Sequence, residues 1–432
     1  MTKKTKCPNV LIFFTDQQRW DTVGAHGNPL DLTPNFDMMA EKGRFIRNSF
    51  TCQPVCGPAR SAFQTGKYPT TTGCYRNDIP LPPGEKTLAH YFGEAGYETG
   101  YIGKWHLAET DPVPQSQQGG YDEWLAANIL EFTSWPYQTD LFDRKGERHR
   151  LPGYRVDALA DAAIRHIDRA RDKPFFLFLS FLEPHHQNQH DNYPAPVGYA
   201  ERIARRITSY PSDLDTLGGT TKEHYHGYMG MVARLDEAFG RIIDALISRG
   251  ELDNTIILFT SDHGCHFKTR NAEYKRSCHE ASIRVPTLLA GPGLDGKGDI
   301  TRAASLIDLP PTLLDAAGIE IPAAMEGRSL LRPTDRPEDE VFIQISESQV
   351  GRALRAGRWK YCVADPDADG WSDSASRRYV ETHLYDLERD PAELDNLVAA
   401  PDYAGVRDEL AKRLAARIIA AGEAPAEIVP GN

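Results

Sequence analysis

The run Phe175-Phe176-Leu177-Phe178-Leu179-Ser180-Phe181-Leu182 is the longest apolar stretch of the chain and sets the class of fold that the sequence can adopt. It is far too short for a membrane span, which needs about 20 apolar residues in a helix. A continuous apolar run of this length, without alternating polar positions, is typical of a strand that is buried on both faces of a parallel sheet. We therefore predict a sheet that is covered by helices on both sides.

Further β-rich runs alternate with helical patterns along the chain, as expected for an α/β fold. These runs cover residues 9–15, 98–103, 174–182, 255–261 and 286–290. Apolar residues recur at helical spacing through 223–249, and Gly250 supplies a stop signal. We predict a large mixed, mostly parallel sheet sandwiched by helices.

The chain of 432 residues is longer than one core usually accommodates, so we expect a second, smaller unit. A charged, proline-containing stretch at 335–340 has the composition of a boundary. We predict a large α/β domain over residues 1–335. Residues 336–432 are predicted to form a smaller C-terminal α+β subdomain with a short antiparallel sheet and a closing helix at about 403–421.

Composition excludes several classes of partner. Lys and Arg number 49 against 61 Asp and Glu, and the formal charge of −12 disfavours binding to nucleic acid and to anionic membranes.

Residues 1–7 lack an apolar signal core, so we expect a cytoplasmic protein. The seven cysteines are scattered and contain no Cys-x-x-Cys pair, which predicts reduced thiols rather than a disulfide framework.

Polar residues directly follow four of the predicted strands, at the carboxyl ends where open α/β sheets place their sites. These residues are Asp16, Gln17, Lys104, His106, Glu183, His185, Asp262 and His263. Each of them alone is more often a helix cap, a turn former or a surface residue. Their joint occurrence at one edge of a sheet predicts a functional site.

The side chains in this set suggest a metal and an anion. Asp16, Gln17, Asp262 and His263 can hold a divalent cation with open positions, and their oxygen atoms favour calcium or magnesium, with manganese also compatible. The cations of Arg60, Lys104 and Lys275 can neutralise charge on a transferring oxyanion. The imidazoles of His106 and His185 have an intrinsic pKa suited to proton transfer near neutral pH. A small anionic group is therefore the expected target.

The run Cys56-Gly57-Pro58-Ala59-Arg60, which precedes a predicted helix at 58–64, resembles the signature at which sulfatases convert a cysteine to formylglycine (3-oxoalanine). A hydrated aldehyde beside a divalent cation offers one oxygen for attack and a second to expel the product. The alternative interpretation of an isolated cysteine is a buried or helix-capping residue.

Most of the chain resembles the sulfatases of the alkaline phosphatase superfamily. The matching stretches are 9–16, 56–66, 96–97, 103–106, 184–185, 261–264, 275–286 and 384–397. The Cys56 signature and the run Gly103-Lys104-Trp105-His106 are the specific ones. Their order and number indicate a sulfuric ester hydrolase with an alkaline phosphatase-like fold.

The resemblance also implies a role for each site residue. Asp16, Gln17, Cys56, Asp262 and His263 would surround the metal, Arg60 would hold the nucleophile and Lys104 a sulfate oxygen. One hydroxyl of the hydrated aldehyde would attack sulfur in line, while His185 and Lys275 assist departure of the alcohol. His106 would then take a proton from the other hydroxyl, so that sulfate leaves and the aldehyde returns. Maturation would require a formylglycine-generating enzyme as a partner.

The sequence departs from the common family pattern at several positions. Ala59 stands where Ser is frequent, Gln17 where Asp is frequent and His263 where Asn is frequent, so calcium is expected with magnesium and manganese as alternatives. No proline follows His185, which leaves His186 and His190 as alternatives for its role.

Two other functions stay open. A phosphonate monoester or phosphodiester hydrolase shares the formylglycine and the Asp-Gln and Asp-His pairs, and an inactive homologue would retain only the metal. The substrate expected first is a sulfated saccharide or a small aryl or alkyl sulfate. Loops at 124–137, 185–196 and 352–373 contain Trp and Arg residues suited to its recognition.

Overall fold

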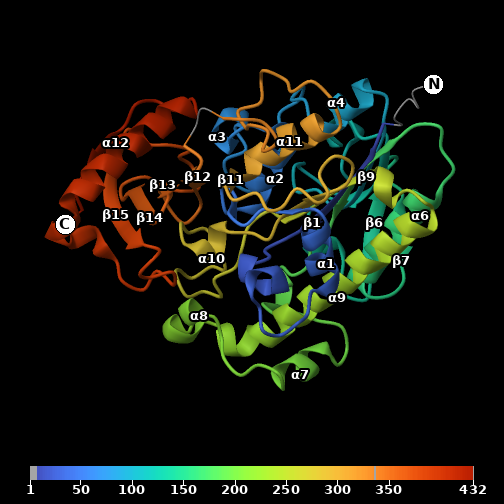
Figure 1. Ribbon diagram of the computed structural model, residues 1–432, viewed down its shortest axis with the longest axis horizontal. Coiled ribbons are helices and arrows are strands. Elements are labelled where there is room, and N and C mark those ends of the chain that lie inside the picture. Colours follow the sequence, from blue (N-terminus) through green and yellow to red (C-terminus); the bar gives the residue numbers. More distant parts are fainter. Residues whose placement is uncertain (1–6, 335–336, 432) are drawn as a thin grey trace.

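The computed structural model describes residues 7–334 and 337–431 (Figure 1). Two predictions fall partly outside this range. The amino-terminal residues 1–6 are not described. The predicted domain boundary, between residues 335 and 336, also falls on residues that are not described.

Within the described residues, nine strands form one sheet in the order β2-β10-β9-β1-β8-β4-β5-β6-β7. The central five strands are parallel: β9 (Thr255–Ser261), β1 (Asn9–Thr15), β8 (Phe175–Ser180), β4 (Glu98–Lys104) and β5 (Glu123–Ala127). The outer strands are antiparallel: β2 (Arg44–Phe45), β10 (Leu288–Ala290), β6 (Thr139–Asp143) and β7 (Arg148–Leu151). The predicted mixed sheet with a parallel centre is confirmed.

Two apolar layers cover the faces of this sheet. Because successive side chains of a strand point to opposite faces, Phe14 packs toward α2 (Cys56–Thr65), whereas Phe13 packs toward α6 (Arg155–Asp168) and α9 (Thr221–Ser248). Figure 1 shows α6 and α9 side by side on one face. The opening apolar run is buried at every position of β8, as predicted for a strand covered on both sides.

Observed element ends differ from the predicted ones by one or two residues. The strand predicted at 174–182 is shorter, because ladder pairing ends at Ser180 although Phe181 and Leu182 stay buried. The helix predicted at 58–64 begins at Cys56, so this cysteine lies in the first turn rather than before the helix. The remaining helices are α1 (Pro34–Lys42), α3 (Pro69–Thr72), α4 (Leu88–Glu94), α5 (Leu130–Thr133), α7 (Tyr199–Ala204), α8 (Ser212–Leu217), α10 (Glu280–Ile283) and α11 (Leu309–Ala316), and β3 (Ser49–Phe50) pairs with β11 (Ala304–Ser305).

The described residues that follow residue 337 contain a second sheet, with five strands in the order β12-β13-β14-β15-β16. They are β12 (Glu340–Ile345), β13 (Val350–Ala356), β14 (Trp359–Asp365), β15 (Arg378–Asp386) and β16 (Glu427–Val429), all antiparallel to their neighbours except β16, which runs parallel to β15. Helix α12 (Ala404–Ala420) packs its apolar face on this sheet. It is the closing helix predicted at 403–421.

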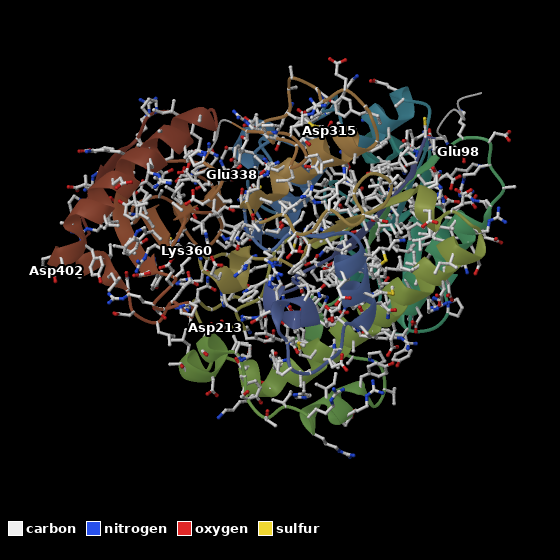
Figure 2. All side chains as sticks on the ribbon, in the orientation of Figure 1. Glu98, Asp213, Asp315, Glu338, Lys360 and Asp402 are labelled. Carbon is white, nitrogen blue, oxygen red and sulfur yellow. The ribbon has the colours of Figure 1, made fainter. Side chains whose placement is uncertain are left out.

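The small sheet packs directly against the large domain, beside α2, α3 and α10 in Figure 1. Lys360 of β14, labelled at this junction in Figure 2, is fully buried, and its Nζ lies 2.8 Å from Glu280 Oε1 and 2.7 Å from Glu393 Oε1. A buried cation needs such partners, so this triad fixes α10 relative to the small sheet.

All the cysteines lie within the described residues and carry free thiols, as predicted. Among those residues, no helix has both the length and the apolar character that crossing a bilayer requires.

Candidate active site

The carboxyl ends of β1 and β9 bring four potential metal ligands together. The strands pair in parallel with Thr15 opposite Ser261, so the residues that follow them emerge side by side. Ligand atoms of Asp16, Cys56, Asp262 and His263 all lie within 4.8 Å of one another, and each residue is buried. The predicted clustering of residues from three distant segments is therefore present.

The carboxylate of Asp262 has the geometry of an incomplete cation site. Its Oδ1 accepts hydrogen bonds from the backbone N–H of Gln17 (3.0 Å) and of His263 (2.8 Å), whereas its buried Oδ2 has no hydrogen-bond donor among the described residues. Burial and the nearby Asp16 raise the pKa of Asp262 to about 6. The Oδ2 atom has an ion-pair contact with Arg60 Nε at 3.4 Å but accepts no hydrogen bond from the described residues. Two buried carboxylates with this remaining acceptor capacity fit a divalent cation, which would relieve their repulsion.

The amide of Gln17 borders the cluster. Its Nε2 donates to the hydroxyl of Tyr193 (3.0 Å), which turns its Oε1 toward Lys275 Nζ at 3.4 Å. The amide oxygen thus contacts Lys275 Nζ, which itself contacts Cys56 Sγ of the cluster.

Cys56 lies at the amino end of α2, where backbone N–H groups favour an anion. Its Sγ is 3.2 Å from His263 Nε2, 3.6 Å from Asp16 Oδ1 and 2.8 Å from Lys275 Nζ. Burial and Asp16 oppose ionisation of the thiol, but Lys275, Lys104 and His263 together lower its pKa to about 6. The side chain at position 56 therefore contacts both the metal cluster and the cations.

Two further cations converge on Asp16. Arg60, one turn after Cys56 on α2, places Nη2 2.8 Å from Asp16 Oδ2, and its Nη1 donates to Ser180 Oγ at 2.7 Å. Lys104 Nζ lies 3.0 Å from the same Asp16 oxygen. Burial alone would raise the pKa of Asp16, but Lys104, His185 and Arg60 hold it well below the usual value. Asp16 is thus an anion throughout the neutral range.

His185 is the histidine of its loop that contacts the cluster. Its Nε2 is 3.0 Å from Lys275 Nζ, and burial together with Lys275 holds its pKa well below 6.5. His186 stacks on the far side of His185 with ring centroids 4.3 Å apart, and the exposed His190 stacks on Trp135. Of the three candidates, His185 is the one that contacts Lys275.

His106 follows β4 in a left-handed backbone conformation with φ 60°. Its Nδ1 is buried and has no hydrogen-bond partner within the described part of the chain. Burial and the charge of Lys104 lower the pKa of His106 to about 4, so the imidazole is neutral near pH 7 but a weaker base than its intrinsic pKa led us to expect.

Two residues near the cluster were not predicted or were assigned differently. Glu131 of α5 accepts a bond from Lys104 Nζ at 2.9 Å. The stretch 124–137 was expected to be a recognition loop, but it contains β5 and α5, and a single glutamate within it carries no sequence signal of its own. Glu183, by contrast, forms a buried pair with Arg155 at 2.8 Å and supports the loop rather than the site.

The mixed sheet with its parallel centre, together with the smaller C-terminal sheet, gives the chain an alkaline phosphatase-like fold. The Sulfatase family model matches residues 8–319, and the chain belongs to the sulfatase family. The predicted enzyme class, sulfuric ester hydrolase, is confirmed by this membership.

Named relatives span nearly the whole chain. An ulvan-active sulfatase of Formosa agariphila is 28% identical over 439 residues, covering 96% of this chain and 82% of that protein. A choline-sulfatase of Rhizobium meliloti is 29% identical over 455 residues, covering 91% and 83%.

Solved structures share the fold. One, in complex with its substrate D-glucosamine-2-N,6-O-disulfate, has a TM-score of 0.78 at 23% identity and covers 96% of this chain and 98% of its own. A phosphonate monoester hydrolase of Agrobacterium radiobacter has a TM-score of 0.70 at 24% identity and covers 96% of each chain. At these identities the likeness concerns the fold alone.

Proposed function

We propose that this sulfatase hydrolyses the sulfate ester of a saccharide or of a small aryl or alkyl alcohol, with formylglycine derived from Cys56 as the nucleophile. The observation that carries this proposal is the position of Cys56 Sγ, 2.8 Å from Lys275 Nζ and within the metal-ligand cluster. Such a position suits a group that must meet a tetrahedral anion beside a cation.

The metal ligands in this proposal are Asp16, Gln17, Asp262, His263 and the side chain at position 56. Their mainly oxygen donors favour calcium, with magnesium and manganese as alternatives. When bound, the cation would act as a Lewis acid and neutralise charge on the sulfate group.

The cations of the chain would position the same group. Lys104 is held by Asp16 and Glu131 with its Nζ beside the cluster, where it can bind a sulfate oxygen. Arg60 is fixed by Asp16 and Ser180 and would orient the side chain at position 56.

Proton transfers would be divided between two sides of the site. His106, neutral at pH 7, would take a proton from position 56 as sulfate is released. His185 and Lys275, in contact at 3.0 Å, would assist departure of the alcohol. This arrangement supports separate residues for the acid and the base.

The chain organisation and the maturation partner are part of the same proposal. We assign residues 1–335 to the catalytic domain and residues 336–432 to the C-terminal subdomain, whose described strands all follow residue 339. A formylglycine-generating enzyme of the host would oxidise Cys56 before the site can act.

The test is expression with and without such a maturation enzyme. We expect mass analysis of the peptide containing Cys56 to detect the aldehyde only with the maturation enzyme, and turnover of 4-nitrophenyl sulfate to require it. Cys56→Ala is the inactive reference, and Cys74→Ala, which removes another buried cysteine, is the matched control. Full turnover by protein with an unmodified thiol would refute the nucleophile.

A phosphonate monoester or phosphodiester hydrolase is the second candidate. Phosphonate monoesters and phosphodiesters are tetrahedral monoanions like a sulfate monoester, so a metal site that contains the neutral amide of Gln17 could serve either class of ester. Comparison of an aryl sulfate with an aryl phosphonate decides between the two, because a large preference for the phosphonate would exclude our first choice. An inactive metal-binding homologue would bind the cation but turn over neither ester.

A further inference from the structure

Two loops of the C-terminal subdomain reach the surroundings of Cys56. Gly57, the next residue, donates its backbone N–H to Asn77 Oδ1 at 2.9 Å, and Asn77 donates its own N–H to Glu347 Oε1 at 2.7 Å. Two hydrogen bonds therefore connect the nucleophile's helix to the loop that follows β12. Lys275 and Cys56 also act electrostatically on the Glu347 carboxylate, as expected for groups that share one site.

Glu347 fixes the position of Arg276. The Glu347 side chain is fully buried, and its Oε2 pairs with Arg276 Nη2 at 2.5 Å. Ser348 Oγ donates to the carbonyl of Arg276 at 2.6 Å. Because Arg276 directly follows Lys275, these contacts hold a guanidinium next to the leaving-group side of the proposed site.

Trp371 stands on the neighbouring loop of the same subdomain. Its loop is anchored by a hydrogen bond from Glu347 N–H to the carbonyl of Gly370 (2.8 Å) and by another from Tyr75 to the carbonyl of Ser372 (2.9 Å). The indole is nevertheless 43% exposed. A large aromatic side chain on a braced loop is a rigid platform for a ring.

Two guanidinium groups flank this indole. The Cζ atoms of Arg76 and Arg276 lie 5.9 Å and 5.7 Å from the Trp371 ring centroid. Arg276 has carboxylate partners, whereas Arg76 has none within ion-pair distance in residues 7–334 and 337–431, and its buried Nε lacks an acceptor there. In a chain of net charge −12, an arginine without a counter-ion is a binding group for an external anion.

We infer that Arg76, Arg276 and Trp371 form a subsite for the leaving group, and that the substrate is an acidic saccharide. A sugar ring would stack on Trp371, and a carboxylate on that ring would pair with Arg76. This inference rests on the proposed function, because it describes the alcohol part of the sulfate ester. Glu347 is a positioning residue in this subsite.

The experiment uses competitive inhibition of the matured full-length enzyme with 4-nitrophenyl sulfate as the reporter. The probes are disaccharides prepared from heparin and chondroitin sulfate, each compared with its carboxyl-reduced form. We expect at least one uronate probe to inhibit about tenfold more strongly than its reduced form. Arg76→Ala should reduce this ratio to less than about twofold, and Arg76→Lys should retain an intermediate ratio, because lysine keeps the charge but not the bidentate geometry.

Trp371→Ala should weaken inhibition by both forms, since stacking does not depend on the carboxylate. Arg202→Ala is the matched control for Arg76→Ala. Arg202 also places its guanidinium over an aromatic ring, that of Tyr199, but it belongs to α7 and not to the proposed subsite. The inference is wrong if every uronate probe and its reduced form inhibit equally, if neither inhibits, or if Arg76→Ala preserves the ratio. If the proposed function is wrong, the wild-type enzyme will not turn over 4-nitrophenyl sulfate. Calorimetric titration of the wild type and its variants with the same probes would then still test the subsite.

Discussion

Lys275 Nζ contacts both Cys56 Sγ, at 2.8 Å, and His185 Nε2, at 3.0 Å. One cation from the loop after β9 thus joins the amino end of α2 to the loop after β8. Burial is the main cause of the lowered pKa of His185, and the charge of Lys275 lowers it further. At Cys56 the same charge acts against burial and Asp16, which raise the pKa of the thiol.

Lys275→Ala should reduce kcat for 4-nitrophenyl sulfate by about 100-fold, because loss of one preorganised donor costs roughly 3 kcal/mol of transition-state stabilisation. Lys275→Arg should recover part of the activity. Steady-state kinetics measure the effect, with the exposed Lys86→Ala as the control. A kcat within twofold of wild type would exclude Lys275 from the reaction.

Removal of divalent cations should abolish turnover and lower the melting temperature, since a ligand present at 100 times its Kd stabilises the folded state by about 2.7 kcal/mol. Chelation followed by addition of calcium, magnesium or manganese, with activity and thermal unfolding recorded, identifies the metal. Asp262→Asn should eliminate the metal-dependent rise in melting temperature. A rise that persists in this variant would place the cation elsewhere.

Lys360→Ala should destabilise the protein by about 3–5 kcal/mol, because Glu280 and Glu393 would remain as buried carboxylates without their cation. Urea unfolding measures this loss. The triple replacement of Lys360, Glu280 and Glu393 by apolar residues should recover much of it. If Lys360→Ala unfolds at the same urea concentration as wild type, the triad does not hold the small sheet against α10.

Asp140 on β6 should contribute stability that depends on pH. A hydrogen bond from Arg150 outweighs burial and, with Arg148, lowers the pKa of Asp140 to about 2. Because the folded pKa is below the unfolded one, near 3.9, the contribution is complete above about pH 5 and is lost as the pH falls toward the folded pKa.

The difference in unfolding free energy between wild type and Asp140→Asn should therefore be constant above about pH 5 and shrink as the pH falls from about 4 toward 2. Chemical denaturation at several pH values measures it. A difference that stays constant or grows on acidification would contradict the role of the carboxylate charge.

Much of the fold could be predicted because its signals are local. The apolar run at 175–182 required burial on both faces, and polar residues after strands identified the carboxyl edge as the site, since parallel strands end at the same edge. Asp16 and Asp262 meet because β1 and β9 are adjacent in register. The strand order itself was not predicted, because any of several crossover connections fits the same pattern of strands and helices.

The sequence by itself determined strands β1, β4, β8, β9 and β10, the edge of the sheet that carries the polar cluster and, through the Cys56 signature, the family to which the chain belongs. Tertiary structure decided which side chains touch: that His185 rather than His190 contacts Lys275, that Glu131 pairs with Lys104, and that Arg76 lies beside Trp371. The physical reason is that strand and helix patterns arise from neighbours in the chain, whereas these contacts join segments that are distant in sequence and meet only through strand order, loop paths and the packing of the small sheet on the large domain.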